Sequence, residues 1–266
     1  PDEARTCNIT GCYEYSPQGS YSAGMNYLNM LKPLEYTLHR GCDGVTGAFS
    51  GVESPELSEY ATFEDLYAEY KKQLLAVINV TVDTVNGFEP YLSEINPLSL
   101  LSATFPSCLA KAKDAIEGGG SYNGSVLLFG FLGDITDSLM MIKKYVYEKK
   151  ELSLSELVSA LDKSFDGNEI LRRKLLADRE KWCNNKERPD AIACDLVNFI
   201  TANLCGRPNA REGAWTCGFH VARMSYIQGK KTAASANGIG SSLHGVITIL
   251  GLSSSIYPRD DGTIYP

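Results

Sequence analysis

Residues 8–19 read NITGCYEYSPQG, and this short segment places a thiol and a carboxylate two positions apart. Cys12 follows Gly11, Glu14 comes two residues later, and Pro17 interrupts the segment further on. Residues two apart in an extended chain point to the same side, so Cys12 and Glu14 can address one substrate. Taken alone, however, a cysteine is most often a small buried hydrophobic residue. What this segment does therefore depends on the rest of the chain.

Composition and charge describe an ordinary globular protein. The chain has 266 residues, of which 44% are hydrophobic and 21% charged, values typical of a packed protein. Its 25 basic and 32 acidic residues give a net charge of −7. Binding to nucleic acid or to an anionic membrane needs clustered Lys and Arg, whereas pairs such as Lys71-Lys72 and Lys143-Lys144 fit solvated helix faces. We expect neither partner.

The apolar segments are too short to cross a membrane. The runs VLLFGFL (126–132) and GVITILGL (245–252) fall well below the roughly 20 residues that a membrane helix needs. The N-terminus, PDEART, has no signal-peptide pattern and no Met. We therefore expect a cytoplasmic protein whose given sequence begins inside a longer one.

The cysteines and histidines give little support for a metal site or a disulfide framework. The eight cysteines are scattered and contain no C-x-x-C pair; they are Cys7, Cys12, Cys42, Cys108, Cys183, Cys194, Cys205 and Cys217. The three histidines, His39, His220 and His244, lie far apart in the sequence. This arrangement favours reduced thiols in a cytosol and predicts no metal site and no directly bound cofactor.

Hydrophobic periodicity predicts an α/β fold in one domain or part of one. Helices are expected at 62–80, 136–150, 153–165, 168–182 and 190–204, and a buried strand within SVLLFGFLG (125–133). Thr62 with Asp65, and Ser153 with Glu156, have the spacing of helix N-terminal caps. The segment EGGGSYNG (117–124) lacks the spacing of a phosphate-binding loop, so a tight glycine turn is the better interpretation.

The order of several segments resembles the glycyl radical enzymes, the pyruvate formate-lyase-like family. The resemblance begins with GCYEY and continues through NMLKPLEYTLHRGCDGVTG (29–47), EGGGSYNG, DSLMMIKKYVYEKKELSLSELVSALDKSFDG and LRRKLLADREKWCNN. It ends with GKKTAASANG (229–238), which is similar to the family's T-x-x-S-P-D/N-G segment. No single motif is specific, but the ordered set covers residues 7–238.

The resemblance implies both a fold and a reaction. The fold would be part of a ten-stranded α/β barrel with the cysteine loop inside, and the reaction a radical C–X cleavage of dehydratase or lyase type on a small polar substrate. Cys12 would be the thiyl carrier and Glu14 the acid–base group. The full-length parent would be a homodimer, and its glycyl radical would be installed by an activating enzyme that uses an iron–sulfur cluster and S-adenosylmethionine.

Departures from the family pattern leave alternatives open. Pyruvate formate-lyases proper carry two adjacent cysteines, whereas Gly11 precedes Cys12; this favours the dehydratase or lyase branch over a formate C-acetyltransferase. Residues 239–266 do not resemble the family, and the R-V-x-G-[WY] radical motif is absent from the sequence. We expect 1–238 to be a central barrel fragment without the N-terminal half and the radical domain, and therefore inert by itself. A non-catalytic scaffold remnant is the alternative of a different class.

Overall fold

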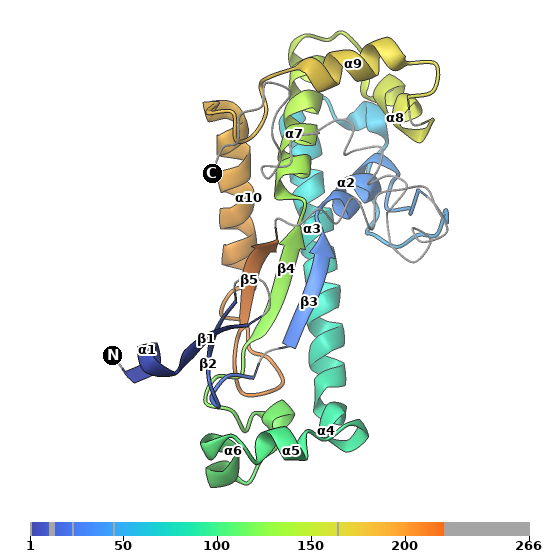
Figure 1. Cartoon of the computed structure of the whole chain (residues 1–266). Helices are drawn as coiled ribbons and strands as arrows, with labels where there is room; N and C mark the ends of the chain where they lie inside the picture. The colour runs from blue at the N-terminus through green and yellow to red at the C-terminus, as the bar shows by residue number, and fades with distance from the viewer. Residues whose placement is uncertain (1, 11–13, 23, 45, 164, 221–266) are drawn as a thin grey trace. The chain divides into compact units, whose positions relative to one another are not determined.

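A computed structural model of the chain describes residues 2–10, 14–22, 24–44, 46–163 and 165–220, although the side chains of residues 2, 3, 10, 14, 15 and 220 are not among those described. The strands are β1 (Cys7–Thr10), β2 (Glu14–Pro17), β3 (Gly24–Asn29), β4 (Ser125–Gly130) and β5 (Trp215–His220). The helices are α1 (Asp2–Thr6), α2 (Leu31–Leu38), α3 (Phe63–Phe88), α4 (Leu92–Ile95), α5 (Ser99–Ser102), α6 (Pro106–Lys111), α7 (Leu132–Ile142), α8 (Leu154–Asp162), α9 (Glu169–Ala177) and α10 (Glu187–Leu204). Short 3₁₀ turns cover Leu57–Glu59, Glu89–Tyr91 and Ala115–Glu117, and a π-helix covers Lys143–Glu148 (Figure 1).

The strands form two small sheets. Strands β1 and β2 make an antiparallel hairpin in which Cys7 pairs with Pro17 and Thr10 with Glu14. The other sheet has the order β3-β4-β5, and Figure 1 shows its three arrows pointing the same way. The α/β class is therefore confirmed. The described residues contain two-stranded and three-stranded sheets, so the ten-stranded barrel stays a prediction.

The chain divides into two compact units built from interleaved segments. Unit 1 comprises Pro1–Tyr27, Ile78–Leu128 and Thr201–Gly218; unit 2 comprises Leu28–Val77, Phe129–Ile200 and the described residues from Phe219. Buried apolar side chains form the core of unit 1, among them Ile78, Val82, Leu127, Leu204 and Trp215. The core of unit 2 includes Leu31, Leu34, Leu66, Tyr70, Leu74, Phe129, Ile135 and Leu139. The domain boundaries expected from the sequence stay a prediction.

Helix α3 begins where its capping signal predicts. The Asp65 amide donates to the Thr62 hydroxyl at 3.2 Å, and the Asp65 carboxylate accepts from the Thr62 amide at 2.8 Å. The expected helix 62–80 continues to Phe88, because Val82 supplies one more buried contact beyond the regular stripe. The stripe therefore predicted the start of the helix better than its end.

The other predicted helices are present, with different ends. Ser153 and Glu156 form the expected capping box at the start of α8. Helix α7 begins four residues before the expected position 136 and passes into the π-helix at Lys143. Helix α9 ends at Ala177 rather than at 182, where the Asp178 carboxylate accepts hydrogen bonds from Lys144 and Tyr145 instead.

The glycine-rich segment 117–124 is a tightly packed turn, as the sequence predicts. Gly118 has φ +95°, and a Cβ there would lie 2.6 Å from the Arg211 carbonyl oxygen. A Cβ on Gly119 would lie 2.3 Å from the Lys113 carbonyl oxygen. The carbonyl oxygens of Gly118 and Gly120 accept hydrogen bonds from the Lys111 ammonium. Close backbone packing accounts for these glycines without a bound phosphate.

Two findings concern membrane segments and cysteines in the part of the chain that the structure describes. Within that part, no helix combines the length and the apolarity that crossing a bilayer requires. Seven of the eight cysteines are described, and among them Cys7, Cys42, Cys108, Cys194, Cys205 and Cys217 form no disulfide. Cys12, the segment 229–238 and the tail 239–266 lie outside the described residues.

Candidate functional site

Glu14, one of the two residues singled out by the sequence, lies at the connected end of the β1–β2 hairpin. Glu14 is the first residue of β2 and pairs through its backbone with Thr10, the last residue of β1. The connection between the strands, residues 11–13, lies outside the described residues, and Cys12 lies with it. The side chain of Glu14 is not described either. That Cys12 and Glu14 face one cavity therefore stays a prediction.

Backbone hydrogen bonds hold the chain that follows this hairpin against the glycine turn of unit 1. The Ser22 amide donates to the Tyr122 carbonyl at 2.8 Å, and the Tyr122 amide donates to the Ser20 carbonyl at 2.9 Å. The Gly24 amide then donates to the Gly124 carbonyl at 3.1 Å, next to the start of β3. The tight glycine turn thus fixes the path between the candidate Cys12–Glu14 segment and the three-stranded sheet.

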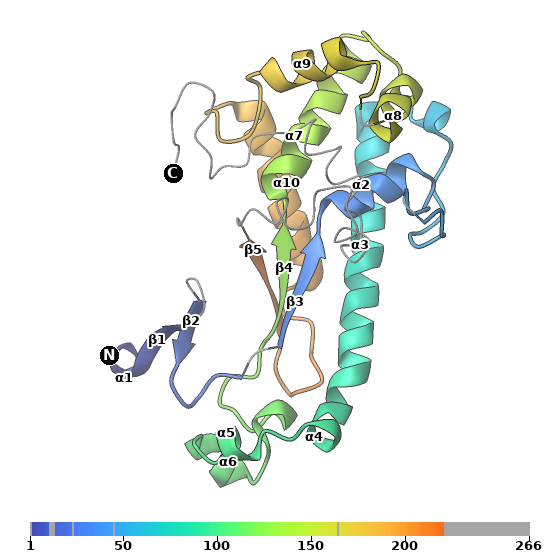
Figure 2. The same ribbon diagram turned by 45° about the vertical axis from the view of Figure 1, so that its right-hand side comes forward.

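Several polar residues lie just after β3 and β4, and the sequence did not predict a site there. Lys32 and Glu35 lie on α2, which follows β3 in Figure 2, and Asp134 lies on α7, which follows β4. The two strand ends meet, because the Met30 amide donates to the Gly130 carbonyl at 3.2 Å. The C-terminal ends of parallel strands are the usual place for functional groups in α/β folds. This edge of unit 2 is therefore a second candidate region.

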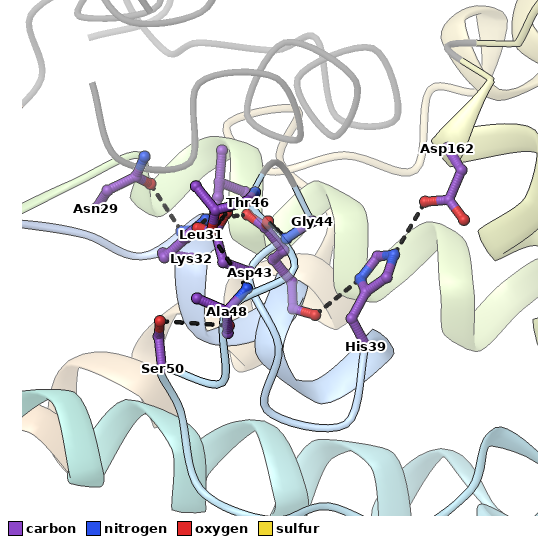
Figure 3. Close-up of polar contacts among 11 residues, drawn as sticks. Asn29, Leu31, Lys32, His39, Asp43, Gly44, Thr46, Ala48, Ser50 and Asp162 are labelled. Carbon is purple, nitrogen blue, oxygen red and sulfur yellow. Dashed lines mark hydrogen bonds and ion pairs between the residues drawn. The ribbon is translucent and has the colours of Figure 1, made fainter. Parts of the chain in front are cut away.

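Lys32, Glu35 and Asp43 form a buried charged cluster in this region, and Figure 3 labels Lys32 and Asp43. The Lys32 ammonium lies 2.8 Å from the Glu35 carboxylate and also pairs with Asp43. Lys32 is 5% exposed, Glu35 1% and Asp43 8%. Buried charges of this kind need partners, because an unpaired one is costly to remove from water. One cation between two carboxylates leaves the cluster with one negative charge when all three are ionised.

This cluster holds the loop after α2 in place. Glu35 accepts a hydrogen bond from the Gly44 amide, and Asp43 accepts from the Thr46 amide at 2.7 Å and from the Thr46 hydroxyl at 3.0 Å. Burial raises the pKa of Glu35, while the adjacent Lys32 opposes that shift. Because both carboxylates are committed to loop contacts, positioning of the chain is the role that their geometry supports.

His39, at the end of α2, is a structural residue by its contacts. Its Nδ1 lies 3.0 Å from the Glu35 carbonyl oxygen and its Nε2 lies 2.9 Å from the Asp162 carboxylate (Figure 3). Both ring nitrogens are therefore occupied. Among the described residues, no group of three or more His, Cys, Asp or Glu side chains could hold a metal ion.

Asp134 is a buried acid of unit 2 with a strongly raised pKa. It lies in the first turn of α7 and is 6% exposed. The helix follows Phe131, whose φ of +72° turns the chain sharply out of β4. Burial raises the pKa of Asp134 to about 7, and a hydrogen bond with its own backbone offsets only part of that shift. The sequence signal for this residue is a single acid inside the apolar segment 126–135.

Similarity to known proteins extends over most of the chain. The family model described as Pyruvate formate lyase-like matches residues 1–226. The trans-4-hydroxy-L-proline dehydratase of Clostridioides difficile is 29% identical over 238 residues, which are 89% of this chain and 30% of that protein. The (2S)-3-sulfopropanediol dehydratase of Klebsiella oxytoca is 26% identical over 243 residues, which are 89% of this chain and 29% of that protein.

Solved structures agree with the sequence comparison. The crystal structure of hydroxyproline dehydratase from Clostridioides difficile, with trans-4-hydroxy-L-proline bound, matches with a TM-score of 0.76 and 29% identity. That match covers 82% of this chain and 28% of the dehydratase chain. The chain thus spans about 30% of the length of the curated relatives it matches. The extent of the family match and the shared fold together show that this chain belongs to the pyruvate formate lyase-like family.

Proposed function

We propose that this chain is a segment of a glycyl radical enzyme that cleaves a C–X bond of a small polar substrate, as a dehydratase or lyase. One observation carries the proposal: the Gly11-Cys12-x-Glu14 segment lies within a family match that covers residues 1–226. The relatives that match 89% of this chain include dehydratases of trans-4-hydroxy-L-proline and (2S)-3-sulfopropanediol, and isethionate sulfite-lyases. Family membership supports the radical class, and Gly11 before Cys12 supports the dehydratase or lyase branch.

Cys12 and Glu14 divide the chemistry between them. A glycyl radical on another segment supplies the thiyl state of Cys12. In that state Cys12 accepts a hydrogen atom from a substrate carbon, becomes a thiol, and leaves an unpaired electron on the carbon. That carbon radical acidifies an adjacent hydroxyl group, whose proton Glu14 accepts as a general base. Glu14 then returns that proton to the leaving group, which departs in its protonated form and regenerates the carboxylate, and the product radical takes its hydrogen atom back from Cys12.

The backbone around Glu14 supports this division. Glu14 opens a paired strand, so its main chain is fixed by the register with β1, and an acid–base group must be held within hydrogen-bond reach of the proton it accepts. Cys12, two residues earlier, belongs to the connection between the two strands. Residues two apart point to the same side where a chain is extended, and placement of Cys12 and Glu14 on one side of the chain is part of this proposal.

The partners follow from the same proposal. The enzyme takes a small-molecule substrate and needs an activating enzyme that uses an iron–sulfur cluster and S-adenosylmethionine. A homodimer, a ten-stranded barrel completed outside this chain and a cytoplasmic location are parts of the same proposal. Two alternatives lead to different outcomes. A formate C-acetyltransferase would consume pyruvate and coenzyme A, and a scaffold remnant would accept no radical.

The test is anaerobic activation of the protein that carries this segment, with activating enzyme and S-adenosylmethionine, followed by electron paramagnetic resonance. The activated protein is then given trans-4-hydroxy-L-proline, glycerol and (2S)-3-sulfopropanediol in D₂O. We expect product from at least one substrate, and deuterium in the recovered substrate because the Cys12 thiol exchanges with solvent. Cys12→Ser should abolish both, whereas Glu14→Gln should keep deuterium incorporation and lose product.

Cys7→Ser is the matched control, because Cys7 is an exposed cysteine in the neighbouring strand, and it should behave as the wild type. A strong glycyl signal with full turnover in Cys12→Ser would refute the assignment of Cys12. Consumption of pyruvate and coenzyme A, with no elimination product, would select the acetyltransferase instead. A protein that never acquires the glycyl signal would favour the scaffold.

A further inference from the structure

Two cysteines of unit 1 that the proposed reaction does not use lie against each other. Cys205 follows the last residue of α10, and Cys217 lies in β5. Their sulfur atoms are 3.5 Å apart, in contact without a covalent bond. Both side chains are partly exposed. Twelve positions separate the two residues, so their approach is a product of the local fold and not of adjacency in the sequence.

The backbone between the two cysteines is paired, which keeps them together. The Gly206 amide donates to the Trp215 carbonyl at 2.9 Å, and the Trp215 amide donates to the Arg207 carbonyl at 2.8 Å. Pro208 and Ala214 form an antiparallel bridge further along the same loop. Residues 205–217 thus form a closed loop with one cysteine at each end.

The surroundings of Cys217 orient its sulfur towards Cys205. The Thr201 hydroxyl lies 3.7 Å from the Cys217 sulfur, and the Cys205 amide donates to the Thr201 carbonyl at 3.1 Å. One residue, Thr201, therefore contacts both members of the pair. Burial raises the pKa of Cys217, which keeps its thiol protonated and uncharged beside the second sulfur.

We propose that Cys205 and Cys217 are a redox-active thiol pair that a low-molecular-weight disulfide oxidises to an intramolecular disulfide. A disulfide bond is about 2.05 Å long, so the sulfur atoms must approach further from their present 3.5 Å separation. Rotation about the side-chain bonds of two partly exposed residues can provide this movement. The contact between the two sulfur atoms is what marks this pair as the site of the exchange.

The reaction is two successive thiol–disulfide exchanges. The thiolate of one cysteine attacks a sulfur of the oxidant, forms a mixed disulfide and releases one small thiol. The second cysteine, as thiolate, then attacks the protein sulfur of that mixed disulfide and releases the other small thiol. The protein loses two hydrogen atoms and two electrons, and the oxidant is reduced to two thiols.

The experiment treats the anaerobically purified 266-residue chain with oxidised glutathione. Before treatment, thiol titration of the denatured chain should count all eight cysteines as free. After treatment we expect two thiols to be lost without retained glutathione, and trypsin without reductant should release residues 187–211 linked to residues 212–223. Cys205→Ser and Cys217→Ser should each retain one glutathione as a trapped mixed disulfide on the remaining partner. These adducts distinguish pairwise chemistry from general oxidation.

Cys194→Ser is the matched control, because Cys194 is exposed and lies on the same tryptic peptide as Cys205; it should form the linkage as the wild type does. A linkage that disappears in Cys194→Ser would overturn the proposal, as would a wild-type chain whose two thiols stay free or carry separate glutathione adducts. Mapping of the wild-type chain decides the question even if a serine variant folds poorly. Neither outcome depends on radical activity, so the proposed function is tested separately.

Discussion

Replacing Asp134 with asparagine should stabilise unit 2 at neutral and alkaline pH. Asp134 is 6% exposed in the first turn of α7, and burial raises its pKa from 3.8 to about 7. A group with a folded-state pKa above its unfolded value favours folding only while it is protonated. Its contribution is complete below the unfolded pKa and is lost as the pH rises through the folded pKa. The asparagine side chain of the variant would stay neutral throughout.

The size of the effect follows from the two pKa values. A shift from 3.8 to about 7 corresponds to about 4 kcal/mol, at 1.36 kcal/mol per pKa unit, once the pH is well above 7. Part of this penalty is already present at pH 5, so the free energy of unfolding should fall by about 2.5 kcal/mol between pH 5 and pH 8 because of Asp134. The variant should lose this part of the pH dependence. Asparagine also keeps an oxygen that can accept the backbone hydrogen bond.

The assay is urea denaturation at pH 5 and pH 8, followed by tryptophan fluorescence. Trp182 lies in unit 2, where its backbone amide donates to the Asp137 carboxylate at 2.6 Å. The fluorescence of its indole ring therefore reports on the unfolding of this unit. Burial also raises the pKa of Glu35, so only the difference between variant and wild type isolates Asp134. Asp83→Asn, at an exposed position of α3, is the matched control and should keep the wild-type slope. If Asp134→Asn keeps it too, Asp134 is not a buried neutral acid and the reasoning fails.

Three further predictions concern unit 1, α8 and the whole chain. Arg211→Met leaves Glu89 buried without its cation, since the two side chains are 5% and 6% exposed. This change should lower the free energy of unfolding by about 3–5 kcal/mol, and Arg211→Lys should lower it less. A loss below about 1 kcal/mol in urea denaturation would contradict this prediction. Ser153→Ala removes the cap of α8 and should cost about 1 kcal/mol by thermal denaturation, whereas Ser155→Ala, at an exposed site inside the same helix, should cost little; equal losses would argue against the cap. The 266-residue chain should give no glycyl doublet in electron paramagnetic resonance after anaerobic activation, because it lacks the R-V-x-G-[WY] motif; a doublet would assign the radical to a glycine within the chain.

The sequence predicts some residues of the candidate site and misses others. The segment containing Cys12 and Glu14 was found by order of motifs, since residue types and spacing are properties of the sequence. Asp134 was missed, although it interrupts an apolar run, because a single acid there is equally compatible with a strand end or a helix start. Its raised pKa depends on burial by other segments, which periodicity does not report.

The sequence alone determined the family, the α/β class and the starts of helices such as α3 and α8, because capping bonds join residues only three positions apart. Tertiary structure decided where helices end, and it decided which polar side chains meet. Lys32 meets Asp43 across 11 positions, Cys205 meets Cys217 across 12, and Arg211 meets Glu89 from a distant segment. The physical reason is range: a cap is a local hydrogen bond, whereas burial and charge pairing depend on how separate segments pack, and local spacing carries no record of that packing.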